Sequence, residues 1–136
     1  MIDQRTAPYA ALVLRLALGL MFVAHGALKL FVFTPAGTVG YFASLGLPAI
    51  FAYFTIAAEL GGGVLLLLGV ATRPVALALI PLLIGAGVLG HGGNGWVFSN
   101  QGGGWEYPAF LVVAAVVQVL LGDGAAALKP VGYKKG

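Results

Sequence analysis

The chain has 136 residues, of which 60% are hydrophobic and only 8% are charged, and its mean hydropathy is +1.02. A soluble domain of this size needs a polar surface that this composition cannot supply, so a soluble globular protein is excluded. The absence of cysteine excludes disulfides, thiolate metal sites and dithiol exchange. The formal charge of +3 comes without the aromatic-interleaved basic patch that nucleic-acid binding needs, so no nucleic-acid partner is expected.

Four apolar runs follow one another along the chain. They predict helices over residues 8–30, 49–70, 74–90 and 107–122. A spanning helix needs about 20 residues, so the fourth run is short unless it continues through Asp123 to Leu128. Backbone amides in lipid must pair within their own segment, so runs that are apolar on all sides are helices. We therefore predict an all-α protein, an up-down bundle of four transmembrane helices that forms a single domain over residues 1–136.

Basic residues fall mainly on one side of such a bundle. Arg5, Arg73, Lys129, Lys134 and Lys135 share one side, whereas the opposite side has only Lys29 at the end of the first helix. Positively charged connections stay in the cytoplasm, so both termini are expected to be cytoplasmic.

The two connections on the outer side, residues 31–48 and 91–106, differ in kind. The first has Val39, Phe42 and Leu45 near the helical spacing, which predicts a short helix at the membrane interface. The second is rich in glycine and carries Trp96 and Trp105. Its glycines are compatible with backbone nests that hold an anion, or with a flexible loop anchored by interfacial tryptophans.

Two charges stand alone inside apolar runs. Arg15 lies on a stripe of small residues in the first helix, and Glu59 lies on a similar stripe in the second. Their estimated depths and the position of Gln118 in the fourth helix predict one inner polar group in which Arg15 pairs with Glu59. This group is either a structural ion pair or a site for a polar headgroup or a proton-coupled step. In the second case a ligand pocket is expected between the first, second and fourth helices, beside Gly63.

A second polar group is predicted in the outer half. His25 and Lys29 are four residues apart, His91 ends the third helix, and Glu106 and Tyr107 begin the fourth. These residues lack the fixed spacing of a metal site, so no metal is expected, and we interpret them as a hydrogen-bonded cluster or a vestibule. The candidate ligand-binding residues are Arg15, Glu59, Gln118, His25, Lys29, His91 and Glu106.

The two halves of the chain show a weak internal repeat. The first and third helices end in His-Gly, at His25 and His91. The second and fourth helices both close with Leu-Leu-Gly, followed by a basic residue and a proline. The pattern indicates two hairpins related by an axis along the membrane normal, although such a biased composition also produces chance matches.

Several motifs together resemble the DoxX family of small four-helix bacterial membrane proteins. They are Arg-x-x-x-Gly at 15–19, His-Gly-x-x-Lys at 25–29, Ala-Glu-x-Gly-Gly at 58–62, Gly-x-x-x-Arg-Pro at 69–74, Glu-Tyr-Pro at 106–108 and Gly-Asp-Gly at 122–124. The resemblance implies a relative of the membrane subunit of thiosulfate:quinone oxidoreductase, in the bacterial inner membrane. It implies a membrane redox or stress-resistance complex as the setting.

Two functions follow as expectations. The first is a quinone- or lipid-associated subunit of such a complex, with a redox partner protein that brings the electrons. The chain has no catalytic motif of its own and no covalent cofactor is expected, so it is at most the membrane subunit of a quinone-linked oxidoreductase. The second is a non-catalytic scaffold or chaperone for a partner protein. In either case the lipid bilayer surrounds the chain, and a homo-oligomer is a further expected assembly.

Overall fold

The computed structural model describes residues 1–131, and these residues form helices joined by short connections. The only strand-like feature among them is one isolated bridge between Val70 and Lys129. The elements are α1 (Ala7–Ala27), η1 (Leu28–Val32), α2 (Thr34–Ser44), α3 (Ala49–Leu68), α4 (Thr72–Gly85), η2 (Ala86–Gly90), η3 (Gly92–Asn94) and α5 (Glu106–Leu121). The prediction of an all-α protein is confirmed.

Three of the helical stretches are long and apolar enough to cross a membrane. They are Ala7–Val32, Ala49–Leu68 and Thr72–Gly90, and in the first and third the α-helix continues into a π-helical turn. The fourth, α5, is apolar but has only 16 residues. It ends at Leu121 because Gly122 has a φ of 86°, so it does not continue to Leu128.

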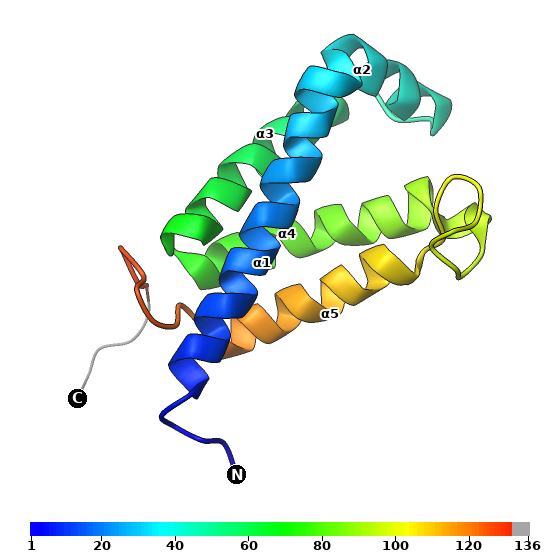
Figure 1. Ribbon diagram of the computed structural model, residues 1–136. Coiled ribbons are helices and arrows are strands. Elements are labelled where there is room, and N and C mark those ends of the chain that lie inside the picture. Colours follow the sequence, from blue (N-terminus) through cyan, green and yellow to red (C-terminus); the bar gives the residue numbers. More distant parts are fainter. Residues whose placement is uncertain (132–136) are drawn as a thin grey trace.

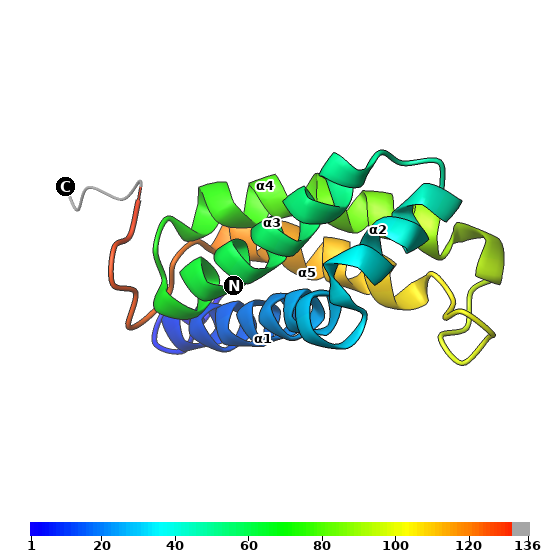
Figure 2. The same cartoon turned by 90° about the horizontal axis from the view of Figure 1, so that it is seen from above.

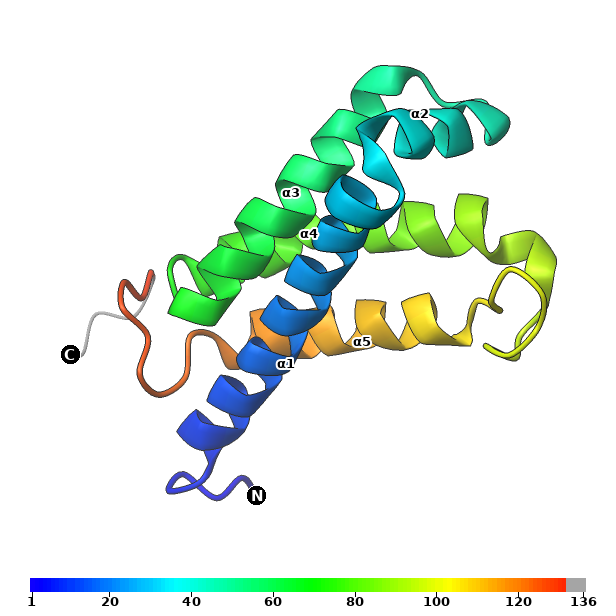
Figure 3. The ribbon, with the colours of Figure 1, turned by 45° about the horizontal axis from the view of Figure 1, so that its top comes forward.

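The helices form two antiparallel hairpins, α1 with α3 and α4 with α5. Figures 1 and 3 show that the hairpins converge at the end that carries the N-terminus and diverge toward α2 and the loop before α5. Seen from above, α2 lies beyond the end of α1 (Figure 2). The C-terminal segment returns to the convergent end, where the Ala125 amide donates to the Pro8 carbonyl at 2.9 Å and the Leu128 amide donates to the Leu68 carbonyl at 3.1 Å. Both described ends of the chain therefore lie at the same end of the bundle.

Glycines allow α1 and α3 to touch through their backbones. A Cβ atom at Gly19 would lie 2.9 Å from the carbonyl oxygen of Gly63, and one at Gly63 would lie 2.9 Å from that of Gly19 and 2.8 Å from the Val23 nitrogen. In lipid the hydrophobic effect does not drive helices together, so they associate through close packing at small residues. The expectation that Gly63 borders a ligand pocket is therefore wrong, because the space beside it is filled by the backbone of α1.

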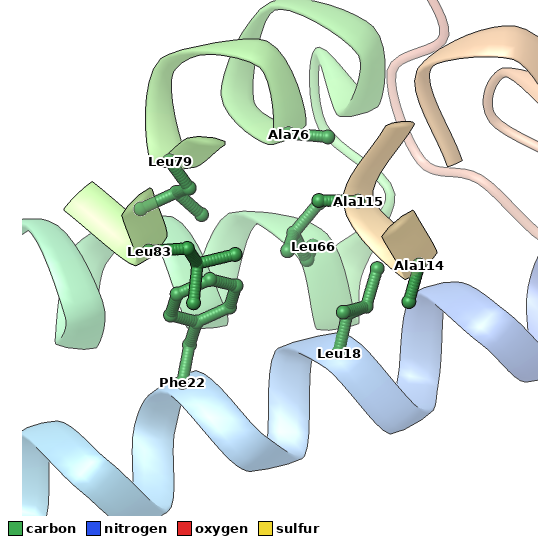
Figure 4. Packing of buried hydrophobic residues seen from close by; sticks show 8 residues of the cluster. All are labelled: Leu18, Phe22, Leu66, Ala76, Leu79, Leu83, Ala114 and Ala115. Atoms are coloured by element: carbon green, nitrogen blue, oxygen red, sulfur yellow. The ribbon is translucent and has the colours of Figure 1, made fainter. Parts of the chain in front are cut away.

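The apolar core lies where the hairpins meet, and Figure 4 shows side chains from α1, α3, α4 and α5 pointing toward one another there. Its buried members are Leu18, Phe22, Leu66, Ala76, Leu79, Leu83, Ala114 and Ala115. Large apolar side chains also cover the outside, for example Phe54, Leu77 and Phe110, which are 64%, 58% and 68% exposed. An outer surface of this kind is suited to contact with lipid.

The two outer connections are ordered by specific hydrogen bonds. The first contains α2, which confirms the helix expected there, and the hydroxyl of Thr38 lies 3.1 Å from the Lys29 carbonyl oxygen. In the glycine-rich loop, Nδ2 of Asn94 donates to the Gly103 carbonyl at 2.9 Å, and Trp96 and Trp105 meet edge to face at 4.5 Å. The loop is thus tied by internal contacts, and its place at the membrane interface stays a prediction.

Candidate functional site

Arg15 lies at the convergent end and is fully buried. Its Nη1 donates to the carbonyl oxygens of Leu66 at 2.9 Å and Leu67 at 3.1 Å, and its Nη2 donates to that of Ala125 at 2.9 Å. Leu66 and Leu67 are in the last turn of α3, where the helix dipole favours a cation, and the Leu66 carbonyl also accepts from the Gly69 amide at 3.1 Å. Arg15 therefore caps α3 and holds the C-terminal segment against it.

The predicted pairing of Arg15 with Glu59 is wrong. Glu59 lies seven residues before Leu66 in α3, which is about 10 Å along the helix axis from the carbonyl that Arg15 reaches. The close contact of Gly19 with Gly63 sets the register of the two helices, and in that register Leu67 is opposite Arg15. The single inner group expected from the sequence is instead two separate polar groups.

Gln118 belongs to the inner one and is also fully buried. Its Nε2 donates to the carbonyl oxygens of Ala11 at 3.3 Å and Gly122 at 2.8 Å, which joins α5 to α1. We call Arg15 and Gln118 the inner polar group. Most of its hydrogen-bonding capacity is used on the backbone of the bundle itself.

The ends of the two hairpins are built alike, which fits the repeat seen in the sequence. Gly69 after α3 has a φ of 69°, and a Cβ there would collide with the Arg15 guanidinium. Gly122 after α5 has a φ of 86°, and a Cβ there would lie 2.9 Å from Nη2 of Arg73. The Nε of Arg73 donates to the Val119 carbonyl at 3.1 Å in the last turn of α5. An arginine thus caps the second helix of each hairpin.

Glu59 pairs with Lys29, in η1 just beyond the outer end of α1. The Nζ of Lys29 lies 3.0 Å from Oε1 of Glu59, to which it donates a hydrogen bond, and 2.9 Å from Oε2. The two side chains are 20% and 8% exposed, so the pair is less enclosed than Arg15. A charged pair in this position costs more than one in water and persists because each charge compensates the other.

His25 and Tyr107 complete this group. The Nδ1 of His25 lies 2.7 Å from the carbonyl oxygen of Met21, so in the neutral ring Nδ1 carries the proton and Nε2 is left as an acceptor. The His25 ring stacks on that of Tyr107 with centroids 6.0 Å apart and planes at 25°, which joins α1 to α5. We call His25, Lys29, Glu59 and Tyr107 the outer polar cluster.

Within residues 1–131, two atoms of the outer polar cluster are buried without a hydrogen-bond partner. They are Oε2 of Glu59, which touches the Lys29 ammonium outside hydrogen-bonding geometry, and the hydroxyl of Tyr107. The inner polar group also has such atoms, the Nε of Arg15 and Oε1 of Gln118. Buried polar atoms are normally paired, so these atoms mark places where a further partner is favourable.

A groove of about 560 Å³ lies beside the first turns of α5, and Tyr107 is among its lining residues. Its lining residues are Trp96, Phe98, Glu106, Tyr107, Ala109, Phe110 and Val113. A second groove, of about 490 Å³, lies between α4 and α5 and is lined by Leu83, Ile84, Gly87, Val88, Gly92, Trp105, Pro108, Ala109 and Val112. Neither groove lies between α1, α3 and α5 at Gly63, where the pocket was expected.

The other two candidate residues, His91 and Glu106, lie in and beside the glycine-rich loop. The Nδ1 of His91 lies 2.9 Å from the Gly103 carbonyl oxygen, and Oε1 of Glu106 accepts from the Phe98 amide at 2.9 Å. Their hydrogen bonds tie the loop rather than join the outer polar cluster. Residues 1–131 contain no group of three histidine, aspartate or glutamate side chains placed to hold a metal ion.

Comparison with known proteins gives a family and two named relatives. Residues 10–92 match the DoxX family. The chain is 34% identical over 123 residues to "Putative oxidoreductase CatD" of Bacillus subtilis (strain 168), covering 90% of this chain and 87% of that protein. It is 37% identical over 86 residues to "Inner membrane protein YphA" of Escherichia coli (strain K12), covering 62% of this chain and 60% of that protein. No solved structure matches the chain.

Proposed function

This chain belongs to the DoxX family of membrane proteins, and we propose that it is a multi-pass subunit of a redox complex in the bacterial inner membrane that binds a quinone. The quinone headgroup lies at the outer polar cluster. Electrons come from a partner oxidoreductase, because the chain carries no flavin or metal-cluster motif. The names of the two relatives, an oxidoreductase and an inner membrane protein, support this setting.

Four spans and cytoplasmic termini form part of the proposal. The shared location of both described ends supports an even number of crossings, and Arg5, Arg73 and Lys129 all belong to that end of the bundle. The 16 residues of α5 span about 24 Å, so the fourth crossing requires local thinning of the bilayer. Single cysteines at Ser44, Ser99 and Lys129 test the orientation. An impermeant thiol reagent should label the first two in intact cells, and labelling at position 129 would reverse the orientation.

The observation that carries the quinone proposal is the partly exposed Lys29–Glu59 pair, held beside His25 and Tyr107. Because the two charges compensate, the site favours a neutral headgroup over a phosphate, whose charge Glu59 would repel. A quinone accepts hydrogen bonds at its carbonyls, and its quinol donates them. The cluster has donors in Lys29 and Tyr107 and acceptors in Glu59 and Nε2 of His25.

The chemistry left to this chain is binding and proton supply. Reduction of a quinone takes up an electron pair and one proton at each carbonyl oxygen. The partner supplies the electron pair, while His25 and Glu59 are the titratable groups next to the headgroup that relay protons.

Purification in mild detergent followed by mass spectrometry of bound quinone tests this function. Wild-type protein should retain a quinone. The double variant Lys29→Met/Glu59→Met should lose the quinone because it lacks the donor and the acceptor, and it should keep its fold because both charges are removed together. The variant Arg5→Gln, which changes an exposed charge at the other end, is the control. A wild-type protein that retains no quinone and binds none when it is added contradicts the proposal.

The scaffold alternative has one observation in its favour. A Cβ added at Gly61 meets nothing within 4 Å, and Gly61 lies on an exposed face of α3 with Ala57 and Val64. Small residues at an exposed position accept the close approach of another helix. The same purification separates the two functions, because a scaffold retains a partner protein or a second copy of the chain without retaining a quinone.

A further inference from the structure

Tyr107 belongs both to the outer polar cluster and to the lining of the groove beside α5. One face of the Tyr107 ring stacks on His25, and the same residue lines the groove beside α5. Beyond Tyr107 the walls are mainly aromatic or aliphatic, with Phe110 and Val113 from α5 and Trp96 and Phe98 from the glycine-rich loop. A polar end and an apolar channel thus meet at one residue.

The loop that supplies Trp96 and Phe98 to this groove is fixed to α5. The carboxylate of Glu106 accepts from the Phe98 amide at 2.9 Å, and the Glu106 amide donates to the Trp96 carbonyl at 3.1 Å. These bonds hold the two aromatic walls in place on the first turn of α5. The groove is therefore a built feature of the fold, with a volume within the usual range for ligand sites.

We propose that the hydroxyl of Tyr107 donates a hydrogen bond to a carbonyl oxygen of the headgroup and that the groove beside α5 holds the apolar tail. This inference rests on the proposed function and names the residues that bind each part of the ligand. Three observations select this arrangement. The Tyr107 hydroxyl is buried and has no partner in the described part of the chain, the Lys29 and Glu59 charges of the same cluster compensate, and apart from Glu106 and Tyr107 the groove is lined by apolar and aromatic residues.

The second groove, between α4 and α5, does not fit the same ligand. Its lining side chains are apolar, apart from the indole of Trp105, and it lies away from His25 and Lys29. A headgroup that needs hydrogen bonds at its carbonyls is therefore better placed in the groove at Tyr107. The two grooves share Ala109, so substitutions beyond that residue are needed to tell them apart.

Two probes and three variants test the inference. The probes are decylubiquinone and the same benzoquinone ring without its decyl chain. Val113→Trp fills the groove, and since Val113 is 59% exposed the larger side chain does not disturb the core. Tyr107→Phe removes the hydroxyl and keeps the ring on His25. Val117→Trp, one turn further along α5 at a 39% exposed residue outside both grooves, is the matched control.

Binding is measured by titration of purified protein in detergent, with helix content checked by circular dichroism. Val113→Trp should weaken decylubiquinone about tenfold and leave the tail-less ring unchanged, because only the tail occupies the groove. Tyr107→Phe should weaken both probes, by about threefold to tenfold, because both have the carbonyl. Val117→Trp should change neither.

The outcomes separate the inference from the proposed function. If wild-type protein binds neither probe, the proposed quinone function fails. If wild-type protein binds decylubiquinone and both Val113→Trp and Tyr107→Phe bind it as tightly, a quinone is bound elsewhere and the inference is overturned while the function stands. Equal losses for Val113→Trp and Val117→Trp would also overturn it, since a bulky residue on α5 would then act without filling the groove.

Discussion

The inner polar group and the outer polar cluster both place charge between apolar helices, but they use it differently. Arg15 is fully buried and donates to three backbone carbonyls, so its partners cannot move without unfolding helix ends. Lys29 is partly exposed and pairs with the buried Glu59 through flexible side chains. A charge fixed by backbone stabilises the fold, whereas a charge held by another side chain can exchange that partner for a ligand.

The structure around the two polar groups also differs. The convergent end around Arg15 is closed by the C-terminal segment, and the hairpins diverge toward the outer half (Figure 1). The groove at Tyr107 lies on that outer half. We therefore propose that the outer polar cluster binds the ligand and that the inner polar group stabilises the fold.

The largest effect on stability is expected for Arg15→Met. The substitution removes the donor from three carbonyl oxygens, two of them at the end of α3, and should cost about 3–5 kcal/mol. Unfolding in a mixed detergent series, followed by circular dichroism, measures the loss. Arg15→Lys keeps the charge without the guanidinium fork and should lose less. A protein with Arg15→Met that unfolds like wild type would show that α3 needs no cap there.

The next effect is the coupling of Lys29 with Glu59. Lys29→Met or Glu59→Met alone leaves one charge uncompensated. The loss of unfolding free energy should lie between about 1 kcal/mol, which is typical of an exposed pair, and about 3–5 kcal/mol, which is typical of a buried one. The double variant should be less destabilised than the sum of the two. The same unfolding assay provides the double-mutant cycle. Additive losses would mean that the pair does not exist in solution.

A smaller effect on stability should distinguish alanine substitutions at two glycines of α3. Gly63→Ala places a Cβ 2.8 Å from the Val23 nitrogen and should cost about 1–3 kcal/mol by forcing α1 and α3 apart. Gly61→Ala is the matched control, since nothing lies within 4 Å and the variant should be as stable as wild type. Equal stabilities for the two variants would contradict the close crossing of the hairpin.

The smallest effect is expected for Glu106→Gln. The carboxamide oxygen still accepts from the Phe98 amide, but without the charge, so the loss should be about 0.5–1.5 kcal/mol and confined to the loop. Hydrogen exchange measured by mass spectrometry should show faster exchange in residues 96–105 and no change in α1 or α3. Faster exchange throughout the chain would mean that the loop supports the whole bundle.

The helical fold could be predicted from the sequence because the hydropathy pattern determines where the helices lie. The four apolar runs gave the helices to within a few residues, and the stripe of Arg15, Gly19 and Gly26 is buried as the helical period predicts. The end of α3 at Leu68 differs from the predicted residue 70 because Gly69 takes a left-handed conformation, which glycine permits but does not require.

The pairing of the charges could not be obtained the same way. Depths counted along two straight helices from a common membrane boundary are wrong by a few residues. They therefore place Glu59 closer to Arg15 than it is. The glycines were the better signal, since placing Gly19 against Gly63 puts Arg15 at the end of α3. The capping role of Arg15 also depends on the C-terminal segment, which folds back and brings Ala125 beside Arg15. No local sequence pattern predicts this fold-back.

Photoaffinity labelling tests the division between the two polar groups most directly. Purified protein is illuminated with an azido-substituted quinone, digested, and mapped by mass spectrometry, with excess decylubiquinone as competitor. We expect labelling that the competitor suppresses in the outer half, on residues 25–29 of α1 and η1 or on residues 106–113 of α5. Suppressible labelling at the convergent end, around Arg15 and Gln118, would contradict it and would assign the ligand to the inner polar group.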